Sequence, residues 1–294
     1  MPTMPGPEAA RSLVPVLAGG GTRLPAHVGV LAALADFGIS VPSYVGVSGG
    51  SIVAALAAAG WPPPRLLRLA LDTDFRRFRG RSLWQLARRG GLSSGEAFEH
   101  WLDELLEGRR FRDLPKDLAV VATDVHTSQP VVFSRKTTPD ERIARAVRCS
   151  MGIPLLFAFQ PYRDHLLVDG SILSEDALQR DWSGDGTPVC FFRLRGEPDT
   201  RPLSTAGLFP LPAYVSMLIR TFMTTLSREF VDARHWPRTV VVEVGSYSPI
   251  DFALREADKH ELYACGYETV RNILPFKFPT LCPPPADAVL PDAS

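Results

Sequence analysis

The sequence has no excess charge of either sign, because its 32 acidic residues balance its 32 basic residues. General nucleic-acid-binding proteins carry a basic excess, so we expect no nucleic-acid partner. Cysteine is also scarce: Cys149, Cys190, Cys265 and Cys282 lie far apart and form no C-x-x-C pair. This spacing indicates neither a zinc site nor a disulfide framework, and we expect free thiols in a reducing compartment and no bound metal.

Long hydrophobic runs are missing as well. The longest, Ile52 to Ala59, is far too short to span a bilayer. Residues 1–7 have neither a charged start nor a long apolar stretch, so they do not resemble a signal peptide. Hydrophobic residues nevertheless make up 45% of the chain, which is typical of a globular protein. We expect a cytoplasmic protein that is soluble or bound peripherally to a membrane surface.

Short apolar segments alternate with helical ones along the first 60 residues. Val14 to Ala18 and Val41 to Val47 are predicted to be buried strands, each followed by a glycine-rich turn and a helix. This order is typical of a parallel sheet with crossover helices, so we predict an α/β fold. Later segments predicted to form strands are 118–122, 131–133, 166–168, 189–194 and 239–244.

The composition also indicates the domain organisation. Residues 1–12 are predicted to be a flexible leader, residues 13–275 a single domain, and residues 276–294 a proline-rich tail. Within the domain, residues 65–115 interrupt the strand pattern and are expected to form a helical insertion or cap. Residues 211–230 are predicted to form an apolar helix.

The segment Gly46-Val47-Ser48-Gly49-Gly50 matches the pattern G-x-S-x-G between a predicted strand and a predicted helix. A nucleophilic serine needs a tight turn that lifts its hydroxyl over the sheet edge, and side chains at Gly46, Gly49 and Gly50 would crowd that turn. The following helix points its N-terminus at the hydroxyl, which favours developing negative charge. We predict that Ser48 is a nucleophile, the alternative being a turn without chemistry.

A second glycine-rich loop, Gly19-Gly20-Gly21-Thr22-Arg23, also lies between a strand and a helix. Its backbone N–H groups can converge on a phosphate or on the oxyanion of an acyl-transfer intermediate. A Walker loop is excluded because no G-K-[ST] follows, and a dinucleotide fingerprint is disfavoured because Leu24 stands where a glycine is needed. Beside Ser48, the loop fits an oxyanion hole best, and we expect no cofactor.

The residue that activates Ser48 is less evident. A Ser-His-Asp triad in α/β-hydrolase order would use His235 or His260, but no motif supports either. Only two strands are predicted up to Ser48, which disfavours the α/β-hydrolase fold. Asp169 is a better partner because it ends an apolar strand before Gly170, and strand ends are where α/β sites gather. Asp124 is a rival at another strand end.

In their order and spacing, these motifs resemble the patatin-like phospholipase family. The resemblance rests on the glycine-rich loop, the early G-x-S-x-G and the late Asp169-Gly170 pair. Further similar stretches are His27-Val28-Gly29-Val30-Leu31, Val121-Ala122-Thr123-Asp124, Cys149-Ser150-Met151-Gly152-Ile153-Pro154 and Cys265-Gly266-Tyr267-Glu268. Leu24 stands where the family usually has glycine. Ser171 stands where the family usually has glycine or alanine.

The resemblance implies a patatin-like three-layer α/β/α fold with a mainly parallel sheet. It also implies that Ser48 is the nucleophile, that Asp169 takes its proton, and that the oxyanion is held by the amides of Gly20, Gly21 and Thr22. The expected reaction is hydrolysis of a phospholipid or lysophospholipid through an acyl-enzyme. The alternatives are an acyltransferase or general carboxylesterase that uses the same serine, and a catalytically silent relative that binds lipid or a partner.

Arginines cluster between residues 65 and 91, where Phe75, Phe78 and Trp84 are interleaved with them. The candidate basic patch consists of Arg76, Arg77, Arg79, Arg81, Arg88 and Arg89. Such a patch can dock on anionic lipid headgroups. The other interpretation is a solvated face in a protein that prefers arginine to lysine. The sequence leaves the oligomeric state open.

Overall fold

The computed structural model describes residues 11–80, 82–172, 178, 180–197, 214–215, 217–219, 221 and 234–283. Arg81, the first ten residues of the predicted leader, residues 284–294 of the predicted tail, and most of the predicted helix 211–230 lie outside these ranges. Within them, no helix is both long enough and apolar enough to cross a membrane.

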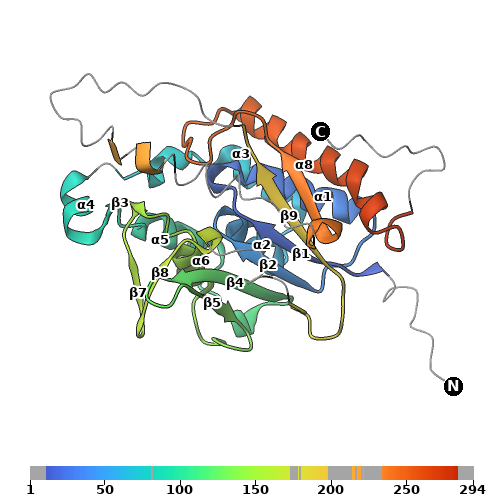
Figure 1. The fold of residues 1–294 in the computed structure, drawn as a ribbon, viewed down its shortest axis with the longest axis horizontal. Helices are drawn as coiled ribbons and strands as arrows, with labels where there is room; N and C mark the ends of the chain where they lie inside the picture. The colour runs from blue at the N-terminus through green and yellow to red at the C-terminus, as the bar shows by residue number, and fades with distance from the viewer. Residues whose placement is uncertain are drawn as a thin grey trace.

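A mostly parallel sheet forms the centre of the molecule (Figure 1). Its strands are β1 (Val14–Ala18), β2 (Ser43–Val47), β4 (Asp117–Asp124), β5 (Gln129–Ser134), β7 (Gln160–Tyr162), β8 (His165–Val168), β9 (Val189–Arg195) and β10 (Thr239–Glu243). The order is β10-β9-β1-β2-β4-β8-β7, and β5 pairs with β4 off this path. The five strands from β10 to β4 run parallel, whereas β5, β7 and β8 add antiparallel pairs at one end.

Helices precede and follow these strands. They are α1 (Pro25–Asp36), α2 (Gly49–Ala58), α3 (Pro63–Asp72), α4 (Leu83–Arg89), α5 (Glu96–Leu105), α6 (Ile143–Ser150) and α8 (Glu256–Lys277). Single turns of 3-10 helix include η2 (Gly21–Arg23), η3 (Phe75–Phe78), η4 (Phe111–Asp113), η5 (Gly170–Ile172) and η7 (Trp236–Arg238). A separate pair of short parallel strands joins β3 (Gly91–Ser93) to β6 (Leu155–Phe157).

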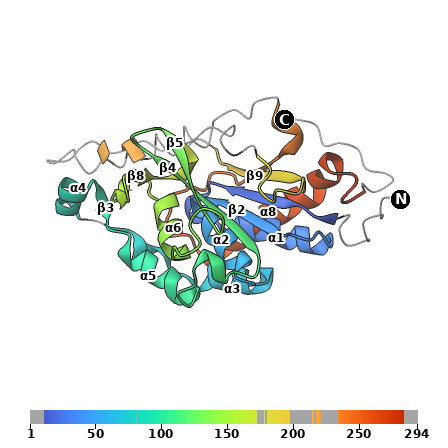
Figure 2. The ribbon, with the colours of Figure 1, turned by 90° about the horizontal axis from the view of Figure 1, so that it is seen from below.

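Strand side chains alternate between two hydrophobic clusters, as the pleat of a sheet requires. Leu17 and Val120 belong to the larger cluster, which also contains the buried residues of α1, α2, α5, α6 and α8. Val16 and Val121 face the other way, where Leu178 and Trp182 cover the sheet within the described part of the chain. Figure 2 shows α1, α2, α3, α5 and α6 below the strands.

The predicted α/β class with a mainly parallel central sheet is confirmed, and helices flank the sheet. The strand predicted at 14–18 is β1, and the predicted insertion at 65–115 contains α4, α5 and β3. One boundary differs: α8 continues through Pro275 to Lys277, and Leu281 and Cys282 beyond it are buried. A proline in the last turn removes one helical hydrogen bond, but burial of the following chain compensates for that loss.

Candidate active site

Ser48 occupies the sharp turn between β2 and α2. Its φ of 53° lies in the left-handed region, which costs a non-glycine residue roughly 1–3 kcal/mol. A Cβ on Gly50 would lie 2.2 Å from the carbonyl oxygen of Leu17, and one on Gly46 would lie 2.4 Å from Cα of Ser51. The packing of this turn therefore requires glycine at both positions.

The register of the strands decides what lies next to Ser48. β2 pairs with β4 as far as Val47 opposite Val121, but β4 continues beyond that point. β5 occupies the other edge of β4 along this extension. β8 must therefore pair with the edge that β2 leaves free, and it does so through Thr123 opposite Val168. The end of β8 is thereby brought to the end of β2.

Asp169 follows β8 directly and contacts Ser48. The hydroxyl of Ser48 donates a hydrogen bond of 2.6 Å to Oδ2 of Asp169, and the backbone N–H of Ser171 donates one of 2.8 Å to Oδ1. The carboxyl group has no exposed surface. Burial raises the pKa of Asp169 to about 6, although both hydrogen bonds favour the charged form. Asp169 is therefore a stronger base than an exposed carboxylate and is still ionised at neutral pH.

The loop at the end of β1 has positive φ at Gly19, Gly20 and Gly21, which glycine adopts without strain. The carbonyl of Gly19 accepts a hydrogen bond from Gly50 N–H, and that of Gly20 accepts one from Arg23 N–H. In a trans peptide the next N–H points the opposite way, so the amides of Gly20 and Gly21 point away from these anchors. Within the described residues neither amide has an acceptor, so both remain available to a substrate oxygen.

The loop also contacts the turn that holds Ser48, because a Cβ on Gly49 would lie 2.6 Å from the nitrogen of Gly21. Thr22 differs from the expectation. Its N–H donates to the carbonyl of Pro249 at 2.9 Å, so this amide is not available to an oxyanion. The reason is tertiary: Pro249 lies on a segment far along the chain that packs against the loop.

Two buried side chains hold the glycine loop through its carbonyl groups. Nε2 of His27 lies 3.2 Å from the carbonyl oxygen of Gly19, and it must carry the proton because a carbonyl only accepts. Burial lowers the pKa of His27 to about 4, so its ring is neutral. Nε of Arg23 donates to the carbonyl of Gly20 at 3.2 Å. Burial lowers the pKa of Arg23 to about 10, which leaves it charged beside the loop.

Sequence reasoning missed the role of Ser150. Its hydroxyl accepts a 2.9 Å hydrogen bond from the backbone N–H of Ser48 and donates one of 2.5 Å to the carbonyl of Val121. Ser150 therefore ties the serine turn to β4. The stretch around it was among those similar to the family, but nothing in the sequence indicated which backbone group it would bind.

The rival acid and the histidines lie in other surroundings. Asp124 accepts hydrogen bonds from Thr127 Oγ1 at 2.8 Å and from the backbone N–H of His126 at 3.2 Å, and Nδ1 of His165 lies 3.1 Å from it. These contacts hold the pKa of Asp124 well below its usual range. His260 lies 3.9 Å from Glu256 on α8. The acid that contacts Ser48 is Asp169.

A narrow apolar cavity adjoins the glycine loop and is lined by Gly21, Thr22 and Leu24, with Ile52 from the first turns of α2. Five phenylalanines form much of its wall: Phe75, Phe78, Phe98, Phe157 and Phe252. A second, smaller apolar cavity shares Leu24, Ile52 and Phe75 with the first. Such a site suits a hydrocarbon chain.

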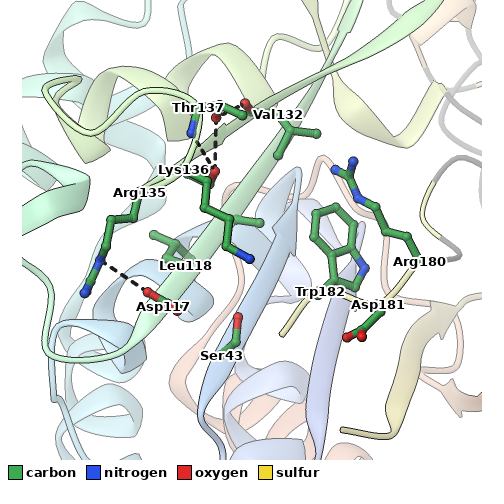
Figure 3. A pocket seen from close by; sticks show the side chains of 12 residues that line it. Ser43, Asp117, Leu118, Val132, Arg135, Lys136, Thr137, Arg180, Asp181 and Trp182 are labelled. Carbon is green, nitrogen blue, oxygen red and sulfur yellow. Dashed lines mark hydrogen bonds and ion pairs between the residues drawn. The ribbon is translucent and has the colours of Figure 1, made fainter. Parts of the chain in front are cut away.

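A larger pocket lies at the other end of the parallel strands, near their first residues (Figure 3). Its wall includes Ser43 and Asp117, the first residues of β2 and β4, whereas Ser48 follows the end of β2. Asp117 lies 3.2 Å from Arg135, so this carboxylate is neutralised by an ion pair. Among the described residues no hydrogen bond joins the hydroxyl of Ser43 to Asp117 or Asp181, whereas that of Ser48 is bonded to Asp169, so Ser48 is the candidate nucleophile.

Known proteins resemble this chain in sequence and in fold. The sequence model of the family described as "Patatin-like phospholipase" matches residues 16–178. YqhO of Bacillus subtilis is 29% identical over 85% of this chain and 94% of its own length. "Probable lipid hydrolase 463L" of Invertebrate iridescent virus 6 is 27% identical over 53% of this chain and 59% of that protein.

Among solved structures, VipD from Legionella pneumophila superimposes with a TM-score of 0.65 at 15% identity. The match covers 91% of this chain and 67% of VipD. At this identity the likeness concerns the fold.

Replacing Asp169 with Asn is expected to stabilise the fold at neutral pH. The folded carboxyl has a pKa of about 6, whereas an unfolded Asp titrates near about 3.9. The folded state binds the proton more tightly, so the original chain loses stability as pH rises from about 4 to about 6. Asn has no charge to bury, and its advantage should reach up to about 3 kcal/mol above pH ~6 and vanish below pH ~4.

Denaturant unfolding at a series of pH values measures this difference. Asp164→Asn is the matched control because Asp164 is exposed, and it should change the free energy of unfolding little at any pH. If Asp169→Asn proved less stable than the original chain at neutral pH, the carboxylate would not be destabilised by burial.

Proposed function

Because the chain belongs to the patatin-like phospholipase family, we propose that it hydrolyses fatty-acyl esters of phospholipids or lysophospholipids with Ser48 and Asp169. The observation that carries the proposal is the 2.6 Å hydrogen bond from the hydroxyl of Ser48 to the buried carboxylate of Asp169. No histidine is needed, because burial makes the carboxylate more basic and the N-terminus of α2 favours negative charge on Ser48.

The reaction proceeds in two steps. Asp169 accepts the hydroxyl proton as Oγ of Ser48 attacks the acyl carbon, and the amides of Gly20 and Gly21 stabilise the oxyanion. The ester C–O bond breaks, the alcohol leaves with the proton from Asp169, and the acyl group remains on Ser48. Water then attacks the acyl-enzyme and gives a proton to Asp169, which returns it to Ser48 as the fatty acid leaves.

The apolar cavity beside Gly21 supports an acyl chain as the portion of the substrate that remains on Ser48. Leu24, which replaces the glycine usual at this position, contributes an apolar side chain to its wall. The charge of Arg23 lies beneath the same loop and adds electrostatic stabilisation to the oxyanion.

Ser48→Ala and Asp169→Asn are each expected to lower phospholipid hydrolysis by more than about a thousandfold, since the two residues act as a unit. His235→Ala and His260→Ala should keep most of the activity.

The hydrolytic activity is measured as release of fatty acid and lysolipid, resolved by ester position. A fluorophosphonate should label the original chain but not Ser48→Ala. A folded histidine variant without activity would contradict the dyad, and acyl transfer to an added alcohol without release of free acid would indicate an acyltransferase.

The pH dependence should show an acid limb near pH 6. Below the pKa of Asp169, about 6, the carboxyl carries a proton and cannot accept another from Ser48. The rate constant kcat/KM is therefore expected to fall about tenfold per pH unit below that point. The limb should persist in His126→Gln and His165→Gln, whose side chains lie near Asp124. A limb that disappears in either variant would contradict its assignment to Asp169.

Phe75→Leu should shift the preference toward longer acyl chains. Phe75 lines both apolar cavities, and a smaller side chain there joins them into one longer space. Leu is chosen over Ala because a large-to-small change at a buried site costs several kcal/mol. The ratio of kcat/KM for long and short acyl chains measures the shift. Leu69→Ala, which enlarges only the second cavity, is the control; an equal shift in both variants would contradict a dividing role for Phe75.

A further inference from the structure

One end of the molecule carries a group of exposed apolar side chains. Figures 1 and 2 both show α4 and β3 at this end, away from α8 and β9. The group, here called the apolar tip, consists of Trp84, Phe159, Tyr214, Met217 and Leu218. Trp84 is 68% exposed, Tyr214 53% and Phe159 42%. Large apolar side chains exposed together are typical of an interaction site.

Close packing brings the members of the apolar tip together. Gly90, at the end of α4, lies so close to Phe159 that a Cβ there would be 2.3 Å from the ring. Residues 214–215 and 217–219 are helical. Val215 and Ile219 pack into a cluster with Leu86 of α4, which leaves Tyr214, Met217 and Leu218 on the outer side. The exposed side chains are therefore held by a packed base.

Several exposed arginines lie in α4 and in the segment that leads into it. Arg76 and Arg89 have carboxylate partners, Asp74 at 2.9 Å and Glu96 at 3.5 Å. Three other exposed arginines of the same segment, Arg77, Arg79 and Arg88, have no carboxylate partner in the described part of the chain. The guanidinium of Arg88 lies 4.8 Å from the ring centre of Trp84, so charge and aromatic surface meet directly.

The apolar tip packs next to the apolar cavity that adjoins the glycine loop. Phe157 lies in the wall of that cavity and also in the cluster beneath Tyr214 and Leu218. In the segment Phe75–Phe78, both phenylalanines line the cavity while Arg77 faces solvent. The buried cluster beneath the apolar tip therefore adjoins the apolar cavity through Phe157.

We propose that the apolar tip and its three arginines dock on the surface of an anionic lipid bilayer. Aromatic side chains with exposed rings partition into the interfacial region, and arginines attract anionic headgroups. The charge surplus favours a bilayer over a second copy of this chain, whose own tip would repel it. This docking rests on the proposed function for its purpose, since it delivers phospholipid to the cavity.

Sedimentation with vesicles tests the docking without any need for hydrolysis. Full-length Ser48→Ala protein is mixed with phosphatidylcholine vesicles in which about one lipid in three is phosphatidylserine. Trp84→Ser in that background should weaken binding roughly tenfold, as should Arg88→Glu, and high salt should do the same. Vesicles of phosphatidylcholine alone should bind much less.

Matched changes elsewhere serve as controls. Trp236 is a half-exposed tryptophan in η7, just before the start of β10. Because β10 runs parallel to β2, the start of β10 lies at the end of the sheet opposite to Ser48. Trp236→Ser and Arg271→Glu should leave vesicle binding unchanged. Where Trp84→Ser folds poorly, Trp84→Phe keeps the packing, and quenching of tryptophan fluorescence by brominated lipids should fall in that variant.

Equal binding by Trp84→Ser and the parent protein, or equal binding to neutral and anionic vesicles, would overturn the proposal. A dimer in solution that Trp84→Ser dissociates, without vesicle binding, would assign the surface to a second copy instead. Vesicle binding by a wild-type chain that releases no fatty acid would overturn the proposed function and leave the docking. Hydrolysis of dissolved lysophospholipid without vesicle binding would do the reverse.

Discussion

The contact between Ser48 and Asp169 depends on one difference in strand length. β4 extends beyond β2, and β8 pairs with the edge that is left free. This register brings a residue 121 positions away to 2.6 Å from the serine hydroxyl. It also buries the carboxylate completely, so the same arrangement that makes the contact sets the basicity of Asp169. A shift of β8 along β4 would remove both effects together.

The glycine loop shows how backbone conformation can be turned into a functional surface. Three consecutive glycines do not by themselves fix the conformation of the loop, because glycine can adopt many backbone conformations besides the positive φ seen here. Hydrogen bonds from His27, Arg23 and Gly50 to the carbonyls select one of them, which directs the amides of Gly20 and Gly21 away from the anchors. In the proposed reaction, buried side chains that need not touch the substrate therefore hold these two amides in place for the oxyanion.

The arginine-rich segment left open two interpretations that the structure partly reconciles. Its aromatic residues separate by environment: Phe75 and Phe78 are buried in the wall of the apolar cavity, whereas Trp84 is exposed beside Arg88. Some of the arginines form ordinary surface ion pairs, as the solvated-face interpretation expects. Others remain without a carboxylate partner at the end of the molecule where the apolar tip lies. One short segment thus joins the proposed docking surface to the proposed acyl site.

The sequence by itself determined the α/β class and the strands around both glycine loops, because local periodicity and turn chemistry encode these features. The strand-end position of Asp169 favoured it over Asp124 as the partner of Ser48, and the resemblance to the family implied the pair. It did not determine that Thr22 N–H binds Pro249, that Ser150 holds the serine turn, or that α8 continues past Pro275. Each of these depends on which distant segment packs nearby. Only the tertiary structure decided the burial of Asp169 and the wall of the apolar cavity. Both depend on residues from several parts of the chain, and no local pattern in the sequence shows that these residues lie close together.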